Sequence, residues 1–139
     1  MSSDKERISA FVDRLIQPIA QKQDSYLKDT TDVLNFIGST KLPKNTVLVS
    51  MDVTSLYTNI PHEEDVTSVC QVYKAPIPTK YLREMPYLIL TETSFQFCCS
   101  IYLQTHGTAM GTKVAVAFAN IFMAIIEKQI LRQSCIIIW

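Results

Sequence analysis

The sequence shows no excess of positive or negative charge. Thirteen basic and thirteen acidic side chains cancel over its 139 residues. Tight binding to nucleic acid without regard to sequence usually needs a basic field, so the composition by itself does not predict such binding. With 47% hydrophobic and 19% charged residues, the composition is that of a globular chain, and the length suffices for one domain with a modest core.

Cysteine and histidine are also scarce. The four cysteines form no C-x-x-C pair, and the two histidines, His62 and His106, do not obviously complete a zinc site with them. No signal peptide is visible, so we expect free thiols in a reducing compartment, with Cys98 and Cys99 chemically inert. His106 is interpreted as a polar loop residue, because no motif places a nucleophile beside it.

No run of apolar residues approaches the roughly 20 that cross a bilayer. The longest candidate, 114–126, contains Asn120 and is predicted to be a buried helix. We therefore expect no membrane partner. The chain stops on the apolar run 136–139, and we expect that it is cut where a strand would continue.

The apolar pattern predicts an α+β chain without repeats or low-complexity tracts. Pro86 should kink or split one of the predicted helices, and Gly38 should end another. Alternating apolar residues predict a hairpin over 94–104, with Cys98-Cys99-Ser100 in its turn. Apolar residues three and four positions apart predict helices over 4–20, 24–38, 79–90 and 113–133.

A further helix is predicted to begin within 58–65 and to reach about residue 73. Asn59 can cap it, Pro61 suits its first turn, and three acidic residues favour its positive end. The cluster His62-Glu63-Glu64-Asp65 is therefore interpreted as the start of this helix rather than as a metal site.

The segment 47–53 is apolar and β-branched, which predicts a buried strand with Asp52 at its end. A carboxylate is costly to bury unless a cation or a donor meets it. Asp52 could hold Mg²⁺, and Tyr57, five residues later, could lie beside the sugar of a nucleotide. Alternatively, Asp52 caps a turn and Tyr57 packs in the core. The spacing alone favours this alternative.

The stretch T-H-G-T-A-M-G-T-K, residues 105–113, places two glycines and three threonine hydroxyls before a helix of small residues. Glycine lets a backbone or a ligand approach closely, and a helix N-terminus attracts phosphate. Lys113 could add a positive charge. The alternative is a tight turn between hairpin and helix. The stretch is not a P-loop, because G-x-x-x-x-G-K-[ST] is absent.

Together these pieces resemble a known family. M-D-V-T-S-L-Y-T-N-I-P-H-E-E, followed by Y-L-Q-T-H-G-T-A-M-G-T-K-V-A-V-A-F-A-N-I-F-M, closely resembles the reverse transcriptase of Penelope-like retroelements. S-Y-L-K-D-T-T-D-V-L-N-F-I, nearer the N-terminus, is similar to the same family. The resemblance covers roughly residues 7–131.

The resemblance implies a partial fingers and palm, with an incomplete antiparallel sheet backed by helices. Residues 1–45 would be a helical fingers-side segment and 46–139 an incomplete palm of the same domain. The implied partners are an RNA template, a DNA primer and deoxynucleoside triphosphates. The implied reaction is nucleotidyl transfer by two Mg²⁺ ions. A nuclear location would follow, although no basic localisation run is visible.

The resemblance also implies roles for individual residues. Asp52 would be a catalytic, metal-binding aspartate, and Val53 would lend its carbonyl to the metal. Tyr57 would exclude a 2′-hydroxyl. Backbone N–H groups would bind the triphosphate, and the glycine-rich loop would lie under the template and nucleotide. The residues concerned are Ser55 and Leu56 for the triphosphate and Met110, Gly111 and Thr112 for the loop.

The sequence departs from the family because it lacks the Asp-Asp pair that would bind the metal ions together with Asp52. No Asp-Asp pair occurs in the 139 residues, so Asp52 alone should not hold two Mg²⁺ ions. The family's Ala-Pro appears as Ala115-Val116, and its usual Asn-Gly turn as Cys98-Cys99. We therefore expect a fragment of a reverse transcriptase that is inactive alone and has an open sheet edge at 47–53. The alternatives are a non-catalytic domain that binds nucleic acid or protein, and a gene remnant that folds poorly.

Overall fold

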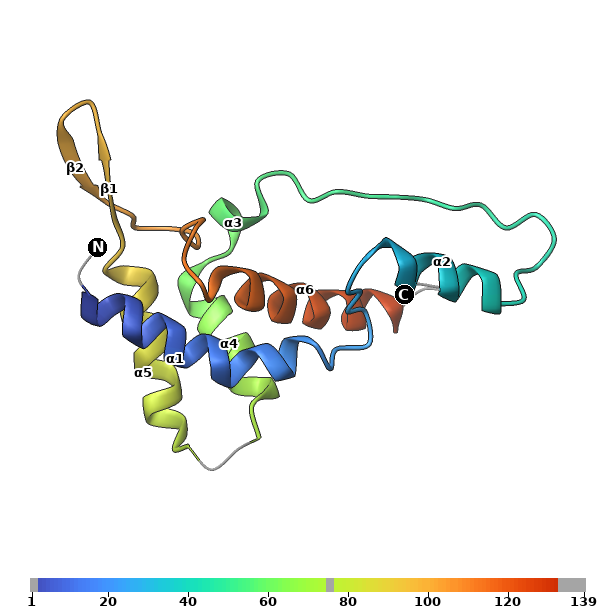
Figure 1. The fold of residues 1–139 in the computed structure, drawn as a ribbon, viewed down its shortest axis with the longest axis horizontal. Helices are drawn as coiled ribbons and strands as arrows, with labels where there is room; N and C mark the ends of the chain where they lie inside the picture. The colour runs from blue at the N-terminus through green and yellow to red at the C-terminus, as the bar shows by residue number, and fades with distance from the viewer. Residues whose placement is uncertain (1–2, 75–76, 133–139) are drawn as a thin grey trace.

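The computed structural model describes residues 3–74 and 77–132. The described part is mainly helical, with one antiparallel sheet of two strands (Figure 1). This mixture agrees with the predicted α+β class. In chain order the elements are α1 (Ser3–Ala20), α2 (Thr30–Ser39), α3 (Leu56–Asn59), α4 (His62–Val72), α5 (Thr79–Thr91), β1 (Ser94–Phe97), β2 (Ser100–Leu103) and α6 (Ala115–Leu131).

Helix α6 lies at the centre of the core. It packs against α1 and α4, and α5 packs against the same two helices (Figure 1). Phe118 and Ile121 of α6 are fully buried, and Val12 and Ile16 of α1 are buried with them in one apolar cluster. Burial of this apolar surface is the main favourable contribution to folding. Small side chains let the neighbouring helices approach α6 closely, namely Ala115, Ala117, Ala119 and Ala124.

Helix α5 contains Pro86, which is fully buried. A proline within a helix removes a backbone donor and clashes with the carbonyl four residues earlier, which is why the sequence predicted a kink or a break. The helix is nevertheless continuous from Thr79 to Thr91. Leu82, Ile89 and Leu90 are buried together with Pro86, so packing on both sides of the proline holds the two halves in one helix.

Helix α2 begins later than the apolar pattern predicted. Asp29 is its N-cap, and the Asp29 side chain accepts hydrogen bonds from the backbone N–H groups of Thr31 at 2.8 Å and Asp32 at 3.2 Å. This cap fixes the first turn, so the predicted start at residue 24 is wrong. Gly38 lies within the helix rather than ending it. No residue of α2 is buried.

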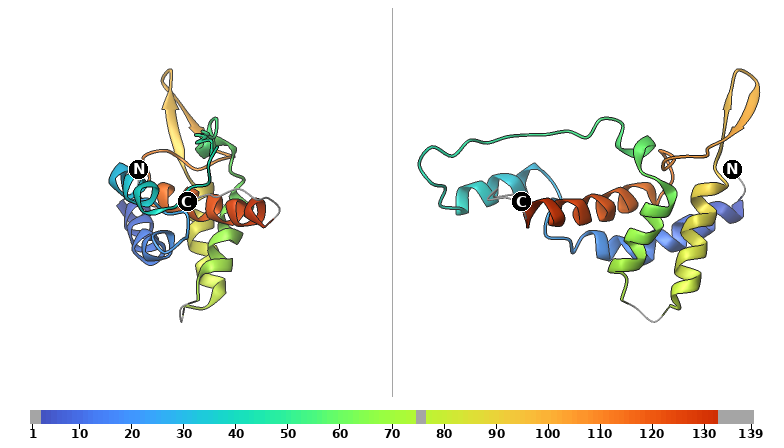
Figure 2. Two further views of the ribbon diagram at one scale, coloured as in Figure 1. Left: turned by 90° about the vertical axis from the view of Figure 1, so that its right-hand side faces the viewer. Right: turned by 180° about the vertical axis from the view of Figure 1, so that it is seen from behind.

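Segment 47–53 is not a strand in the structure. Its residues are all exposed, including Val47 at 79% and Met51 at 85%. The chain passes clear of the helices between α2 and α3 in both Figure 1 and Figure 2. A strand needs a neighbour to pair its N–H and C=O groups, and no described strand lies beside this segment. The predicted buried strand is therefore wrong.

The predicted hairpin is present as β1 and β2. Ser94 pairs with Leu103 and Phe97 with Ser100, which leaves Cys98 and Cys99 as a two-residue turn. Both cysteines have positive φ, 46° and 65°, as a type I′ turn requires, although Asn-Gly adopts this conformation more easily. All eight strand residues are exposed, and the hairpin projects from the helices (Figure 2). The expected sheet backed by helices is therefore not seen in the described residues.

Two expectations lie outside the described residues. These are the strand continuation at 136–139 and the end of the last helix at residue 133. Within the described residues, α6 begins at Ala115 and reaches Leu131, close to the predicted bounds. None of the described helices is long and apolar enough to cross a membrane.

Candidate functional site

The glycine-rich loop lies against α3, and Gly107 makes the closest approach. The backbone N–H of Thr108 donates to the carbonyl of Tyr57 at 2.6 Å. Gly107 has φ +75°, and a Cβ atom there would lie 2.6 Å from the Tyr57 carbonyl oxygen and 2.7 Å from the Thr58 Cα. Only glycine fits this position without moving a backbone. The predicted close approach of a backbone to a glycine of this loop is thus confirmed at Gly107.

The first turn of α4 also contacts this loop. His62 Nε2 lies 2.7 Å from the carbonyl oxygen of Gly107, and the Thr108 hydroxyl donates to Asp65 Oδ2 at 2.9 Å. His62 also stacks on His106, with ring centroids 6.4 Å apart. Two regions that are distant in sequence therefore meet here: the consecutive helices α3 and α4, and the loop that precedes α6. We call this set of contacts the loop junction.

The start of α4 differs in detail from the predicted cap. The helix begins at His62, with Pro61 as its N-cap, and no side chain caps it. Asn59 instead donates from Nδ2 to the Thr54 carbonyl at 3.1 Å, within the turn that leads into α3. The predicted Asn59 cap is therefore wrong, because α3 occupies the residue. The three acidic residues do lie in the first turn of α4, as predicted.

Asp65 is fully buried, unlike the two acidic residues before it. Its Oδ2 accepts the Thr108 hydroxyl, whereas its Oδ1 is buried with no hydrogen-bond partner among the described residues. Burial raises the Asp65 pKa from 3.8 to about 7, against the smaller lowering effect of the Thr108 hydrogen bond. The sequence pattern identifies Asp65 only as one of three acidic residues at the start of this helix. Its spacing from Val66 and Val69, both buried, was the available signal that it faces inward.

Asp52 and Val53 lie on the exposed chain that leads into α3. No described residue forms a hydrogen bond or an ion pair with the Asp52 side chain, and Ser55 rather than Asp52 is the N-cap of α3. Among the described residues, Asp52 therefore neither caps a turn nor meets a cation. Ser55 has φ 54°, and its carbonyl accepts the backbone N–H groups of Thr58 and Asn59.

Of the remaining predicted site residues, some lie at the loop junction and others are exposed to solvent. Leu56 and Tyr57 are half-buried in α3, and Tyr57 supplies the carbonyl that the loop contacts. Met110 is 71% exposed. Gly111 has φ +90° with open space around it, and Thr112 donates to the Ala109 carbonyl at 3.0 Å. The structure therefore unites Tyr57 with the start of the loop, while Asp52 and Met110 stay exposed.

The described residues do not fit a two-metal site. Within 3–74 and 77–132, no group of three or more histidine, cysteine, aspartate or glutamate side chains could hold a metal ion. In enzymes that act on phosphates, Mg²⁺ binds one or two carboxylates together with the substrate phosphates. Two such ions need more carboxylates than the single one of Asp52.

No family model matches the sequence, and no curated protein and no solved structure matches it either. The likeness to reverse transcriptases therefore depends on the residues quoted above.

The glycines offer a matched test of the loop junction. Gly111→Ala should cost about 1–2 kcal/mol, the price of a left-handed residue with a Cβ. Gly107→Ala adds the collision with the backbone of Tyr57 and Thr58, so its total cost should be about 2–5 kcal/mol. Urea denaturation of both variants measures the difference. Equal losses would show that the close approach at Gly107 does not contribute.

The Asp65 carboxyl should make stability depend on pH. Between about pH 4 and pH 7 the unfolded chain loses this proton while the folded chain keeps it, so stability should fall across that window and level off above it. The loss is on the order of a few kcal/mol. Asp65→Asn should remove this pH-dependent loss. The free energy of unfolding of the variant, relative to that of the parent, should therefore be higher at about pH 8 than at about pH 4.

Urea denaturation at the two pH values provides the measurement. Glu64→Gln is the matched control, because Glu64 lies in the same turn of α4 but is exposed. It should leave the pH dependence of the parent unchanged. The same advantage of Asp65→Asn at both pH values would contradict the assignment to Asp65.

Proposed function

We propose that this chain is the nucleotide-binding part of a reverse-transcriptase domain similar to that of Penelope-like retroelements, and that it does not polymerise alone. The observation that carries the proposal is the loop junction. The two segments that resemble the family most closely, one ending near Tyr57 and the other beginning near Gly107, contact each other through their backbones.

The contact supports the proposal because it brings together residues that the resemblance places around one nucleotide. In the resemblance, Tyr57 and the loop flank the same incoming nucleotide, so they must lie close together. The N–H of Thr108 reaches the Tyr57 carbonyl only because Gly107 has no side chain. Ser55 and Leu56, the residues proposed for the triphosphate, directly precede Tyr57 in the same turn.

The inactivity follows from the carboxylates. Asp52 is exposed, and no Asp-Asp pair occurs in the sequence. The chain thus offers the nucleotide a surface but lacks the side chains for the transfer itself. Template, primer and Mg²⁺ belong to this proposal through the resemblance, and no step of the reaction is assigned to these residues.

Nucleotide binding tests the first half of the proposal. A deoxynucleoside triphosphate should shift the methyl signal of Met110 in NMR spectra, and the matching ribonucleotide should bind about tenfold more weakly. Tyr57→Ala should bring the two affinities together, because the side chain that excludes the 2′-hydroxyl is gone. Tyr87→Ala on α5 is the control, since Tyr87 is similarly aromatic and 42% exposed. Absence of any shift with the deoxynucleotide would refute the proposal.

Primer extension tests the second half. On an RNA template with a DNA primer and Mg²⁺ or Mn²⁺, the chain should give no more product than its Asp52→Ala variant. The physical reason is the lack of carboxylates that could hold two ions beside Asp52. Product that depends on Asp52 would overturn the inactivity and leave the family proposal standing.

A second candidate function is a non-catalytic binding domain. The exposed apolar segment 47–53 favours it, because an unpaired extended backbone can accept a strand from a partner. The zero net charge weighs against nucleic acid as that partner. This candidate predicts no response of Met110 to nucleotides, so the NMR titration separates the two functions.

A further inference from the structure

A cavity of about 220 Å³ lies beside α6, away from the loop junction. Its lining includes the apolar side chains of Ala20, Leu27 and Met123, while the chain that follows α1 and helix α6 supply polar groups. Small-molecule sites in proteins combine an apolar lining with a few polar groups that fix orientation. The polar side chains that line this cavity come from Gln23, Ser25, Tyr26, Asn120 and Glu127.

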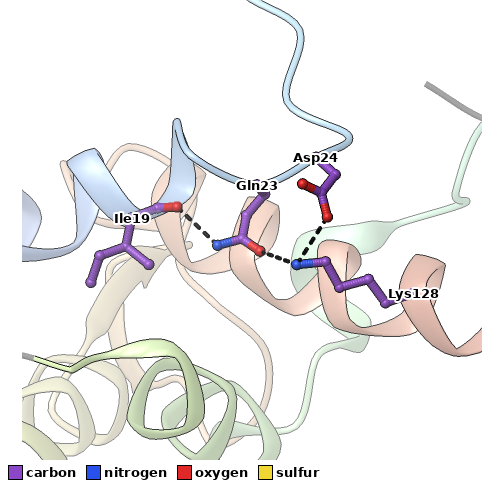
Figure 3. Close-up of polar contacts among 4 residues, drawn as sticks. All are labelled: Ile19, Gln23, Asp24 and Lys128. Carbon is purple, nitrogen blue, oxygen red and sulfur yellow. Dashed lines mark hydrogen bonds and ion pairs between the residues drawn. The ribbon is translucent and has the colours of Figure 1, made fainter.

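One wall of the cavity is held in place by Gln23. Its Nε2 donates to the Ile19 carbonyl at 2.9 Å, and its Oε1 accepts from Lys128 Nζ at 3.1 Å. Lys128 also forms an ion pair with Asp24, 3.5 Å from Nζ to Oδ2 (Figure 3). These contacts fix the side chain of Gln23 at the edge of the cavity. The ammonium group of Lys128 is occupied by Gln23 and Asp24.

Glu127 is the charged residue that lines the cavity. Its Oε2 is buried and has no hydrogen-bond partner among the described residues. The side chain takes part in no described ion pair, and the neighbouring Lys128 pairs with Asp24. A carboxylate oxygen removed from water without a donor carries a cost that a nearby positive charge offsets. Because Oε2 is closed to water, a cation in the cavity would act on it through its charge rather than through a hydrogen bond to this atom.

We propose that this cavity binds a small organic cation with a primary ammonium or guanidinium head, oriented by Glu127. The half-buried Glu127 lines the cavity, so a cation inside it reaches the carboxylate. The volume, below the roughly 300 Å³ at which sites for drug-sized ligands begin, limits the ligand to a short chain. Asn120 and Tyr26 offer further polar partners to the donors of the head group, and Met123 and Leu27 cover its alkyl part.

NMR titration of the full chain with butylammonium tests the proposal. The methyl signal of Met123 should shift and saturate, whereas 1-butanol, of the same shape without the charge, should bind much more weakly. Glu127→Gln should weaken butylammonium binding at least about tenfold, as expected for the loss of a charged hydrogen bond. Circular dichroism checks that this conservative variant is folded.

Glu84→Gln is the matched control. Glu84 is an exposed acid of α5 that does not line the cavity, so the variant changes the net charge equally and should leave binding unchanged. Equal binding of butanol and butylammonium, or unchanged binding by Glu127→Gln, would overturn the proposal. An acetylated tripeptide with a central lysine distinguishes the source of the head group. Tighter binding of the peptide points to a protein side chain, and tighter binding of the amine to a free metabolite.

Discussion

The loop junction depends on a single close approach between two backbones. Gly107 lets the loop before α6 lie against the carbonyl of Tyr57, and His62 and Asp65 then hold that loop from α4. Without this approach, α3 would have little to secure it, because it is only four residues long and none of them is buried. The position of the proposed nucleotide-binding residues therefore depends on the lack of a side chain at Gly107.

The rest of the described chain divides into a part packed in the core and a solvated part. Helices α1, α4, α5 and α6 share one apolar cluster, whereas α2, segment 47–53 and the hairpin contribute no buried side chain. The loop junction lies where the two parts meet, at the start of α6. The proposed cation cavity lies further along α6, which thus connects both candidate sites through one packed helix.

Local patterns predicted the elements that depend on local causes. Apolar spacing predicted α1, α5 and the hairpin, and Pro61 with three acidic residues predicted the start of α4. Ser100, predicted in the hairpin turn, is instead the first residue of β2. The prediction of a strand over 47–53 failed because the residues favour a strand, but a strand forms only when it pairs with another strand. The chemistry of Gly107 was predictable, whereas its partner, Tyr57, was not, since no local pattern tells which backbone approaches. The burial of Asp65 was missed although its position four residues before Val69 was a local signal that it faces inward.

The central place of α6 has a consequence for the order of folding. This helix follows every other described helix in the chain, yet α1 buries its apolar face against it. During synthesis, α1, α4 and α5 emerge from the ribosome first and must wait for α6 with their apolar faces uncovered. Contacts between such distant segments also slow folding. A growing chain of this kind is therefore most exposed to aggregation and to chaperones just before its last described helix appears.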